Sequence, residues 1–327
     1  MPRVFSGIQP TGDLHLGNLL GAIRNWVDDQ HRADSFYCVV DLHALTIPGE
    51  PGQLGVQSLE LAQTLLACGL DPEVCTLFVQ SHVPEHTELA WIMQCLTSFG
   101  ELRRMTQFKD KSDQQSFVSA GLFTYPALQA ADILLYDTDE VPVGEDQRQH
   151  IELTRDVAER FNARFGETFV LPVATIPRAG ARVMDLQEPE RKMSKSASSD
   201  AGIVYLTDDL ATVEKKFKRA VTDSDNEVRY DPATKPGVSN LLSILGAVSD
   251  RDPEQVAADF EQYGPLKAAA AEAVVETLRP IQARLEDLRN DPGAVSEQLG
   301  IGADKARAVA GDVVARARDH IGFLPRH

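Results

Sequence analysis

The sequence predicts an α/β protein: a Rossmann-like parallel sheet with an insertion, followed by a C-terminal all-α helical domain. Three observations lead to this prediction. The first third of the chain alternates short apolar runs with segments of helical period, which is typical of a parallel sheet covered by helices. After Thr207 no strong strand pattern remains. The length of 327 residues leaves room for two domains.

The domain boundary is expected near residue 206. We expect a Rossmann-like domain at 1–206, with a connecting insertion at about 100–140. We expect a helical domain at 207–327, with a last helix that could pack back on the first domain.

Strand and helix patterns alternate in the first domain. Apolar runs predict buried strands at 4–8, 36–40, 76–80 and 141–143. Helical periods predict helices at 15–27, 54–68, 85–99 and from Gly144 to about Phe165, the last with Ile151, Val157 or Ala158, and Phe161 buried. Residues 100–135 break this rhythm, and we expect them to cover the ligand edge of the sheet.

The second domain reads as a series of helices. After Asp208 and Asp209 a helix is expected with Leu210, Val213, Phe217 and Ala220 inward and Lys215, Lys216, Lys218 and Arg219 on its other face. Further helices are expected at 238–248, 254–263, 266–289, with a kink at Pro280, and 303–320. The basic face is a candidate RNA surface, and a solvated helix face explains it equally well.

Composition excludes several classes of protein. Apolar residues make up 43% and charged residues 25%, as in ordinary globular proteins. The N-terminus has no secretory apolar core, and the uncharged stretch 114–131 contains Gly121 and Pro126, so no membrane span is expected. The four cysteines form no C-x-x-C pair and are expected to be reduced core thiols of a cytoplasmic protein. The net charge of −17 argues against a generic nucleic-acid binder but allows a local basic site.

A first motif, residues 9–18 (QPTGDLHLGN), lies between the first strand and the first helix. Nucleotide phosphates bind at this kind of junction. Gly17 allows a ligand to approach the backbone, and His15 and Asn18 can donate hydrogen bonds to phosphate oxygens. The motif is not G-x-G-x-x-G, which disfavours a dinucleotide fold. Taken alone, it is equally well explained as a strand–helix turn with a solvated His15.

A second motif, residues 191–196 (RKMSKS), combines two lysines with two small hydroxyl residues. Cations placed on a loop can stabilise the charge that develops as pyrophosphate leaves. The competing interpretation is a solvated charged loop. The order of the two motifs along the chain favours the functional interpretation.

With these motifs the chain resembles the class I aminoacyl-tRNA synthetases. HLGN is similar to their HIGH signature, and KMSKS matches their second signature. Residues 5–12, 100–109, 130–134 and 143–147 further resemble bacterial tryptophanyl-tRNA synthetases. The resemblance is strong from Arg3 to about Gly246 and weaker beyond.

The resemblance implies an activity and a set of partners. It implies that tryptophan and ATP give tryptophanyl-adenylate and pyrophosphate, and that tryptophan then passes to tRNA(Trp). The helical domain would bind the anticodon. Mg²⁺ would accompany the ATP phosphates without metal ligands from the protein, and the enzyme would be a cytoplasmic homodimer without a membrane partner.

The resemblance also implies site residues. The residues that would bind ATP are Gln9, Pro10, Thr11, Gly17, Asn18, Gly144, Glu145, Asp146, Val183, Lys192, Met193, Ser194, Lys195 and Ser196. Those with catalytic roles would be Lys192, Lys195, Lys111, His15 and Asn18. Those that would bind tryptophan are Asp132, Tyr125, Gln147, Phe5, Gly7, Gln9, Val40, His43, Gln129, Val141 and Val143. Among them Asp132 would accept the indole N–H, while Tyr125 and Gln147 would fix the ammonium and carboxylate.

Physical arguments bear on several of these roles. Asp132 follows an uncharged stretch, so its carboxylate needs a partner. An indole N–H would serve, and so would an intramolecular partner such as Arg or Tyr. Apolar walls at Phe5, Val40, Val141 and Val143 suit an indole, although core packing explains them equally. Asn18 replaces the last His of the signature, which argues against proton donation there, and Gln129 stands where relatives often have Met.

Three rival functions share parts of this pattern. A tyrosyl-specific relative would have the same fold, but the intact KMSKS and residues 144–147 favour tryptophan. A catalytically retired RNA-binding or regulatory paralog would not need Gly17, Asp132, Lys192 and Lys195 together. A metabolite nucleotidyltransferase would lack the helical second domain.

Overall fold

A five-stranded parallel sheet forms the centre of the molecule. The computed structural model describes residues 1–47, 49–108, 117–144, 147–175, 182–194 and 199–325. The strand order is β3-β2-β1-β4-β5, and every neighbouring pair is parallel. The strands are β1 (Arg3–Ile8), β2 (Asp34–Val39), β3 (Thr76–Val79), β4 (Glu140–Pro142) and β5 (Val173–Thr175). The predicted parallel α/β fold is confirmed, and β5 is an additional strand of three residues.

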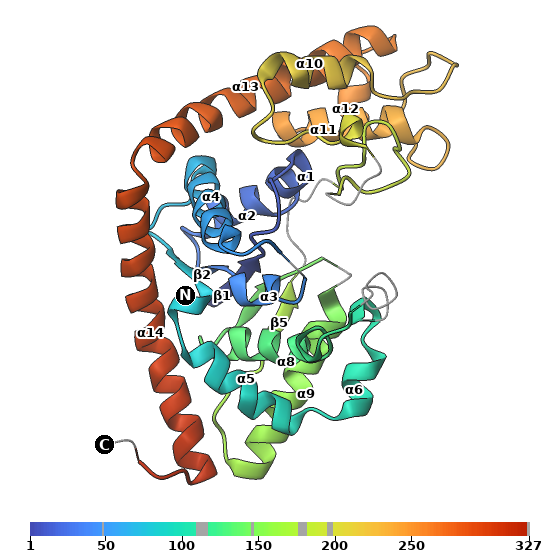
Figure 1. Cartoon of the computed structure of the whole chain (residues 1–327). Coiled ribbons are helices and arrows are strands. Elements are labelled where there is room, and N and C mark those ends of the chain that lie inside the picture. The colour runs from blue at the N-terminus through green and yellow to red at the C-terminus, as the bar shows by residue number, and fades with distance from the viewer. Residues whose placement is uncertain (48, 109–116, 145–146, 176–181, 195–198, 326–327) are drawn as a thin grey trace.

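Helices cover both faces of this sheet and form the second half of the chain (Figure 1). In the first half they are α1 (Leu16–Asn18), a π-helical turn (Leu19–Ile23), α2 (Arg24–Asp29), α3 (Asp41–Ala44), α4 (Gln53–Cys68), α5 (Glu85–Leu96), α6 (Phe99–Arg104), α8 (Ala120–Leu134) and α9 (Arg148–Phe165), with short 3₁₀ turns at Gln80–His82 and Asp200–Gly202. In the second half they are α10 (Leu210–Lys218), α11 (Pro236–Ser249), α12 (Pro253–Ala257), α13 (Tyr263–Asn290) and α14 (Pro292–Ile321).

Several predicted elements differ from the structure. The uncharged stretch expected inside the insertion is largely α8, a helix that packs against α5 and α9. Helix α9 begins at Arg148 rather than Gly144, α12 ends at Ala257, and α14 begins well before residue 303. The basic face of α10 is smaller than expected, because Lys216 donates to Asp208 Oδ2 (2.6 Å) and to the Ile203 carbonyl (2.7 Å).

The central strands divide the core into two layers by simple alternation. Tyr37 and Val39 point to one face, beside α4 and the helices α11 and α13. Phe36 and Cys38 point to the other face, beside α5, α8, α9 and α14. Side chains alternate along a strand, so a run that is apolar at every position must be buried on both faces.

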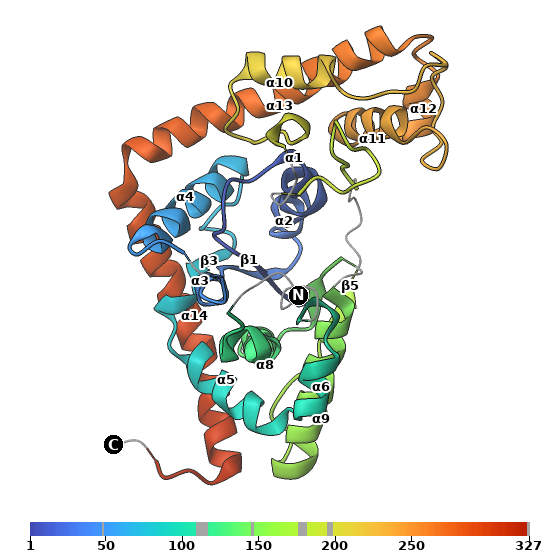
Figure 2. The same ribbon diagram turned by 45° about the vertical axis from the view of Figure 1, so that its right-hand side comes forward.

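The two longest helices bind the halves of the chain together. In Figures 1 and 2, α13 runs across the α10–α12 end and α14 continues down the side of the sheet. The helix α14 contacts β3 so closely that a Cβ on Gly302 would lie 1.9 Å from the Leu77 carbonyl oxygen. The division into domains at residue 207 stays a prediction.

The cysteines and the helices bear on two further expectations. All four cysteines are free thiols, but Cys95 is exposed and Cys68 only partly buried, so the expectation of four core thiols is wrong for these two. Burial raises the pKa of the Cys68 thiol to about 12. No helix in the described ranges is both long and apolar enough to cross a membrane.

Candidate active site

A cleft of about 920 Å³ opens at the carboxyl ends of the central strands. Parallel sheets place ligands at this edge. The predicted site residues that line it are Phe5, Gly7, Gln9, Thr11, His15, Gly17, Asn18, Val40, His43, Tyr125, Gln129, Asp132, Val141, Val143, Gly144, Gln147, Lys192, Met193 and Ser194. Pro10 and Val183 are buried beside it and do not line it. The predicted residues Lys111, Glu145, Asp146, Lys195 and Ser196 lie outside the described residues.

The first motif forms a tight connection from β1 into α1. Gly12 has a φ of +68°, which favours glycine. Asn18 Oδ1 accepts from the His15 backbone N–H (3.0 Å) and so caps the helix start. A Cβ on Gly17 would lie 3.0 Å from the His15 ring, so glycine keeps this wall of the cleft open. His15 is only 5% exposed, so the interpretation of a solvated histidine is wrong.

The second motif is positioned by a short antiparallel hairpin. The Met193 N–H donates to the Val183 carbonyl (3.0 Å), and the Asp185 N–H donates to the Arg191 carbonyl (2.9 Å). Asn240 of α11 clamps the hairpin by bonding both the N–H and the carbonyl of Met184 (2.9 Å each). Lys192 is thereby held exposed at the cleft, opposite the first motif.

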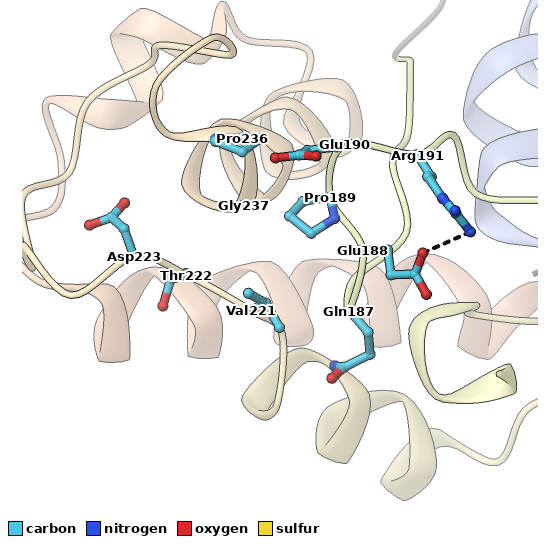
Figure 3. Close-up of a pocket in the computed structure, with 10 residues that line it drawn as sticks. All are labelled: Gln187, Glu188, Pro189, Glu190, Arg191, Val221, Thr222, Asp223, Pro236 and Gly237. Carbon is cyan, nitrogen blue, oxygen red and sulfur yellow. Dashed lines mark ion pairs between the residues drawn. The ribbon is translucent and has the colours of Figure 1, made fainter. Parts of the chain in front are cut away.

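A second hollow of about 530 Å³ lies on the other side of this hairpin (Figure 3). Residues 187–191 form one side of it, and residues 221–223 with Pro236 and Gly237 form the other. Arg191 pairs with Glu188 (3.0 Å). Glu190 and Asp223 add two more carboxylates to the lining, so this hollow does not suit a phosphate.

Several apolar side chains also line the cleft. They are Phe5, Val40, Val141 and Val143, as the sequence predicts for an indole pocket. Gly7 is part of the same wall, and a Cβ there would lie 2.8 Å from a Val40 methyl group. The walls therefore approach each other only because β1 has glycine at this position.

Asp132 lines the same cleft and is 1% exposed. Its Oδ1 accepts from Gln80 Nε2 (2.7 Å) and His86 Nδ1 (2.7 Å), and its Oδ2 accepts from His43 Nε2 (2.7 Å). Burial alone would raise the pKa of Asp132, but the charge and hydrogen bond of His43 and those of His86 hold it well below its usual range. The intramolecular partners are therefore two histidines and a glutamine, not the Arg or Tyr considered from the sequence.

Tyr125 also lines the cleft, beside His43. Its hydroxyl lies 2.9 Å from His150 Nε2 and 3.4 Å from Gln107 Oε1. Burial raises the pKa of Tyr125 to about 12, so the hydroxyl keeps its proton at neutral pH. Gln129 and Gln147 also line the cleft, which gives the middle of the site several hydrogen-bonding groups for an amino acid backbone.

Sequence reasoning missed four polar residues around Asp132 and Tyr125. Gln107 lines the cleft, Gln80 and His86 bond Asp132, and the Tyr136 hydroxyl bonds His86 (2.7 Å). One signal was available, since Gln80 directly follows a buried strand and polar residues at strand ends meet at the ligand edge.

The fold and the cleft together define a class I aminoacyl-tRNA synthetase: a parallel sheet whose HLGN helix start faces a lysine of the second signature. The chain belongs to the family of tRNA synthetases class I (W and Y), whose model matches residues 1–279. It is a tryptophan–tRNA ligase of the bacterial type.

Individual relatives cover the whole chain. Tryptophan–tRNA ligase 2 of Streptomyces avermitilis is 55% identical over 99% of this chain and 98% of its own length. The tryptophan–tRNA ligase of Mycobacterium leprae is 54% identical over 99% and 97%. The tryptophanyl-tRNA synthetase structure from Mycoplasma pneumoniae has a TM-score of 0.92 at 39% identity, covering 99% and 98%. The Campylobacter jejuni enzyme complexed with ADP and tryptophan has a TM-score of 0.84 at 34% identity, covering 98% and 100%.

Proposed function

We propose that this single cleft holds tryptophan and ATP end to end, forms tryptophanyl-adenylate with release of pyrophosphate, and then passes tryptophan to the 3′ end of tRNA(Trp). One observation carries this proposal. The same cleft is lined by apolar side chains and a buried carboxylate, and also by a helix start and the exposed Lys192. These two sets of residues suit an indole and a polyphosphate respectively.

The tryptophan end would recognise both parts of the amino acid. Asp132 would accept the indole N–H, while Phe5, Val141 and Val143 would contact the ring. Tyr125 and Gln147 would fix the ammonium and carboxylate, and both line the cleft with hydrogen-bonding groups. A site that hydrogen-bonds a substrate N–H rejects analogues lacking it, since its own polar group is then unpaired.

The ATP end would bind the nucleotide along the first motif. Gln9 and Thr11 lie in the connection between β1 and α1, Gly17 lies in α1 itself, and all three line the cleft. Backbone N–H groups at such a helix start favour anions. Gly144, with Glu145 and Asp146, would hold the ribose, and Val183 would lie near the adenine. Lys192 to Ser196 and Lys111 would hold the phosphates.

Mg²⁺ would enter with ATP. Among the described residues no group of three or more His, Cys, Asp or Glu could hold a metal ion. The ion would therefore be held mainly by phosphate oxygens and water, which are ligands that Mg²⁺ prefers. The ion would neutralise phosphate charge, and the protein's part is to position the triphosphate.

The reaction needs positioning more than proton transfer. The tryptophan carboxylate is already a nucleophile and would attack the α-phosphorus in line, so no strong general base is required. Lys192 would stabilise the charge that develops on the departing pyrophosphate. The side chain of Asn18 caps the helix start through its Oδ1, so its amide N–H₂ group remains for phosphate oxygens.

Residues 207–327 would bind the tRNA anticodon, and the enzyme would act in the cytoplasm as a homodimer. The large apolar side chains Trp91, Phe99 and Phe117 support the homodimer, because they are 68%, 69% and 71% exposed. Exposed apolar side chains that adjoin one another commonly mark protein interfaces. The Phe99 ring of α6 lies 5.1 Å from the Phe123 ring of α8, so these two helices contribute apolar rings to one surface.

Amino-acid-dependent ATP–pyrophosphate exchange tests the proposal. Tryptophan should support exchange and tyrosine should not, and tRNA charging should follow with the same preference. Exchange with tyrosine alone would favour the tyrosyl-specific alternative. Absence of exchange with every amino acid, in protein that binds tRNA, would favour the retired paralog.

A further inference from the structure

We infer that Gln80, His86 and Tyr136 are positioning residues that assign different tasks to the two oxygens of Asp132. Oδ1 is held by the protein, and Oδ2 is presented to the indole N–H. This inference rests on the proposed role of Asp132 in binding tryptophan.

The hydrogen-bond count separates the two oxygens. Each carboxylate oxygen can accept about two hydrogen bonds. Oδ1 already accepts two, from Gln80 Nε2 and His86 Nδ1, both at 2.7 Å. Among the residues that the structure describes, Oδ2 accepts from His43 alone (2.7 Å). The position left for a ligand donor is therefore on Oδ2.

Tyr136 fixes the proton on His86. Because the Asp132 carboxylate is ionised and only accepts, His86 Nδ1 must carry the proton of that hydrogen bond. The Tyr136 hydroxyl lies 2.7 Å from His86 Nε2, and burial raises the pKa of Tyr136, so the hydroxyl remains a donor. An imidazole that donates from Nδ1 to Asp132 and accepts at Nε2 from Tyr136 then satisfies all three groups.

The three positioning residues come from separate elements that are fixed by packing. Gln80 follows β3, His86 lies on α5, and Tyr136 follows α8. The Tyr136 ring stacks on Phe36 (4.7 Å between ring centroids) and on Phe5 (5.5 Å), which itself lines the cleft. His86 and Tyr136 are fully buried, so they act through Asp132 and do not touch the substrate.

Two kinds of variant test the positioning role in the full-length enzyme. Tyr136→Phe removes only the hydroxyl and keeps the stacked ring. His86→Leu removes the donor to Oδ1, and His86→Asn returns an amide N–H near the Nδ1 position. The matched control is Tyr37→Phe, because Tyr37 is equally buried and its hydroxyl donates to the Trp26 carbonyl (2.9 Å), far from Asp132 in the other core layer.

The measurement is the ratio of kcat/KM for tryptophan to that for β-(3-benzothienyl)alanine, in which sulfur replaces the ring N–H. Tyr136→Phe should lower this ratio about 3- to 10-fold, as expected for one lost neutral hydrogen bond. His86→Leu should lower it about 10- to 100-fold, and His86→Asn should restore most of it. Tyr37→Phe should leave it unchanged. A merely structural role would lower both substrates together and leave the ratio at its wild-type value.

Asp132→Asn separates this inference from the proposed function. If Asp132→Asn keeps the wild-type ratio, Asp132 does not read the indole N–H and the proposed role fails. If Asp132→Asn lowers the ratio strongly while Tyr136→Phe and His86→Leu keep the wild-type ratio, the positioning inference is wrong and the proposed role stands. Should His86→Leu not fold, Tyr136→Phe decides. ¹⁵N spectra should also show His86 protonated on Nδ1, and protonation on Nε2 alone would overturn the inference.

Discussion

Asp132 in the sheet half and Lys235 in the helical half are both buried charges, and they differ in how completely the protein uses their hydrogen-bonding positions. Each is at most 2% exposed. Lys235 Nζ donates to Asp223 (3.1 Å), Asp225 (3.3 Å) and the Tyr263 hydroxyl (3.2 Å), so all three of its N–H groups are used. Asp132 has three donors for about four acceptor positions and lies against the cleft.

This difference separates a structural charge from a functional one. A buried ion whose hydrogen bonds are complete holds its own elements together: Lys235 ties the 223–227 loop to α13 through Tyr263. A buried ion with one open position beside a cavity can select a ligand, because desolvation has already been offset by the protein. Burial alone does not distinguish a structural charge from a functional one, whereas the number of hydrogen-bond partners does.

The largest expected effect is that of Asp132→Asn on tryptophan. Asparagine keeps one acceptor oxygen for Gln80 and His86 but turns an N–H₂ group toward His43 and the indole N–H, so donor faces donor. We expect kcat/KM for tryptophan in ATP–pyrophosphate exchange to fall about 10³-fold. The KM for ATP should stay within about 3-fold of the wild type, as expected for a hydrogen bond made only to tryptophan. Asparagine is preferred to alanine, which would leave three buried donors unpaired.

Lys235→Met is the matched counterpart in the helical half. It should lower the midpoint of thermal unfolding by several degrees, because it leaves Asp223 and Asp225 without their cation. The KM for tryptophan should not change. A large rise in that KM, at a temperature where the variant is folded, would break the distinction between the two charges.

Lys192→Ala is expected to have the next largest effect on activity. Lys192 is exposed at the cleft, and although it is not buried it can stabilise the negative charge that develops in the transition state. Loss of one such contact costs about 10²–10³ in rate. Single-turnover adenylate formation should slow by this factor, while transfer from preformed adenylate to tRNA should be nearly normal because pyrophosphate has already left. Equal losses in both half-reactions would show that Lys192 does not hold pyrophosphate.

The sequence predicted the parts of the site that are contiguous in the chain. The first motif and the second motif are read directly, and the apolar run at 36–40 predicts a strand buried on both faces. The partners of Asp132 could not be predicted this way, because Gln80, His43 and His86 are 52, 89 and 46 residues distant. They lie on α3, on the turn after β3 and on α5, and only folding brings these elements to Asp132 on α8.

Helix α8 was missed for a related physical reason. It contains Pro126 and is buried around much of its circumference, so it has no polar face from which a helical period could be recognised. Lys216 shows the opposite error. Its spacing places it on the basic face of α10, but its side chain bonds Asp208 and Ile203. These two residues precede the helix, so the helical period could not reveal the contacts.

The basic face of α10 extends the same comparison to RNA. Lys215, Lys218 and Arg219 are exposed, whereas Lys216 is paired. Charge reversal of the three exposed residues should reduce tRNA charging about 10-fold near physiological salt and flatten its dependence on salt, with adenylate formation unchanged. Lys216→Met, as the control, should affect stability but not the salt slope. If the triple variant charges tRNA as the wild type does at several salt concentrations, this face does not bind tRNA and is only solvated.

The smallest expected effect is a change in acid stability caused by Asp223→Asn. Burial alone would raise the pKa of Asp223, but hydrogen bonds from Tyr263, from the Asp225 N–H (2.9 Å) and from Lys235 lower it to about 2. The usual value for an unfolded chain is about 3.9. Because the pKa is lower in the folded protein, ionised Asp223 stabilises the fold above about pH 4, and this contribution is lost as the pH falls toward 2.

Unfolding by urea at pH 7, 5, 4 and 3 checks the sign. The wild type should lose stability between pH 4 and 3 more steeply than Asp223→Asn, whose side chain does not titrate, and the two curves should therefore converge at low pH. Asp225→Asn is a suitable control, because Asp225 is 69% exposed at its side chain and shares the same lysine at 3.3 Å. Solvent screens an exposed pair, so its curve should follow the wild type more closely. If the stability curve of Asp225→Asn converges with the wild type at low pH and that of Asp223→Asn does not, Lys235 is held chiefly by the exposed Asp225 carboxylate. A complete set of hydrogen bonds would then not be what stabilises the helical half.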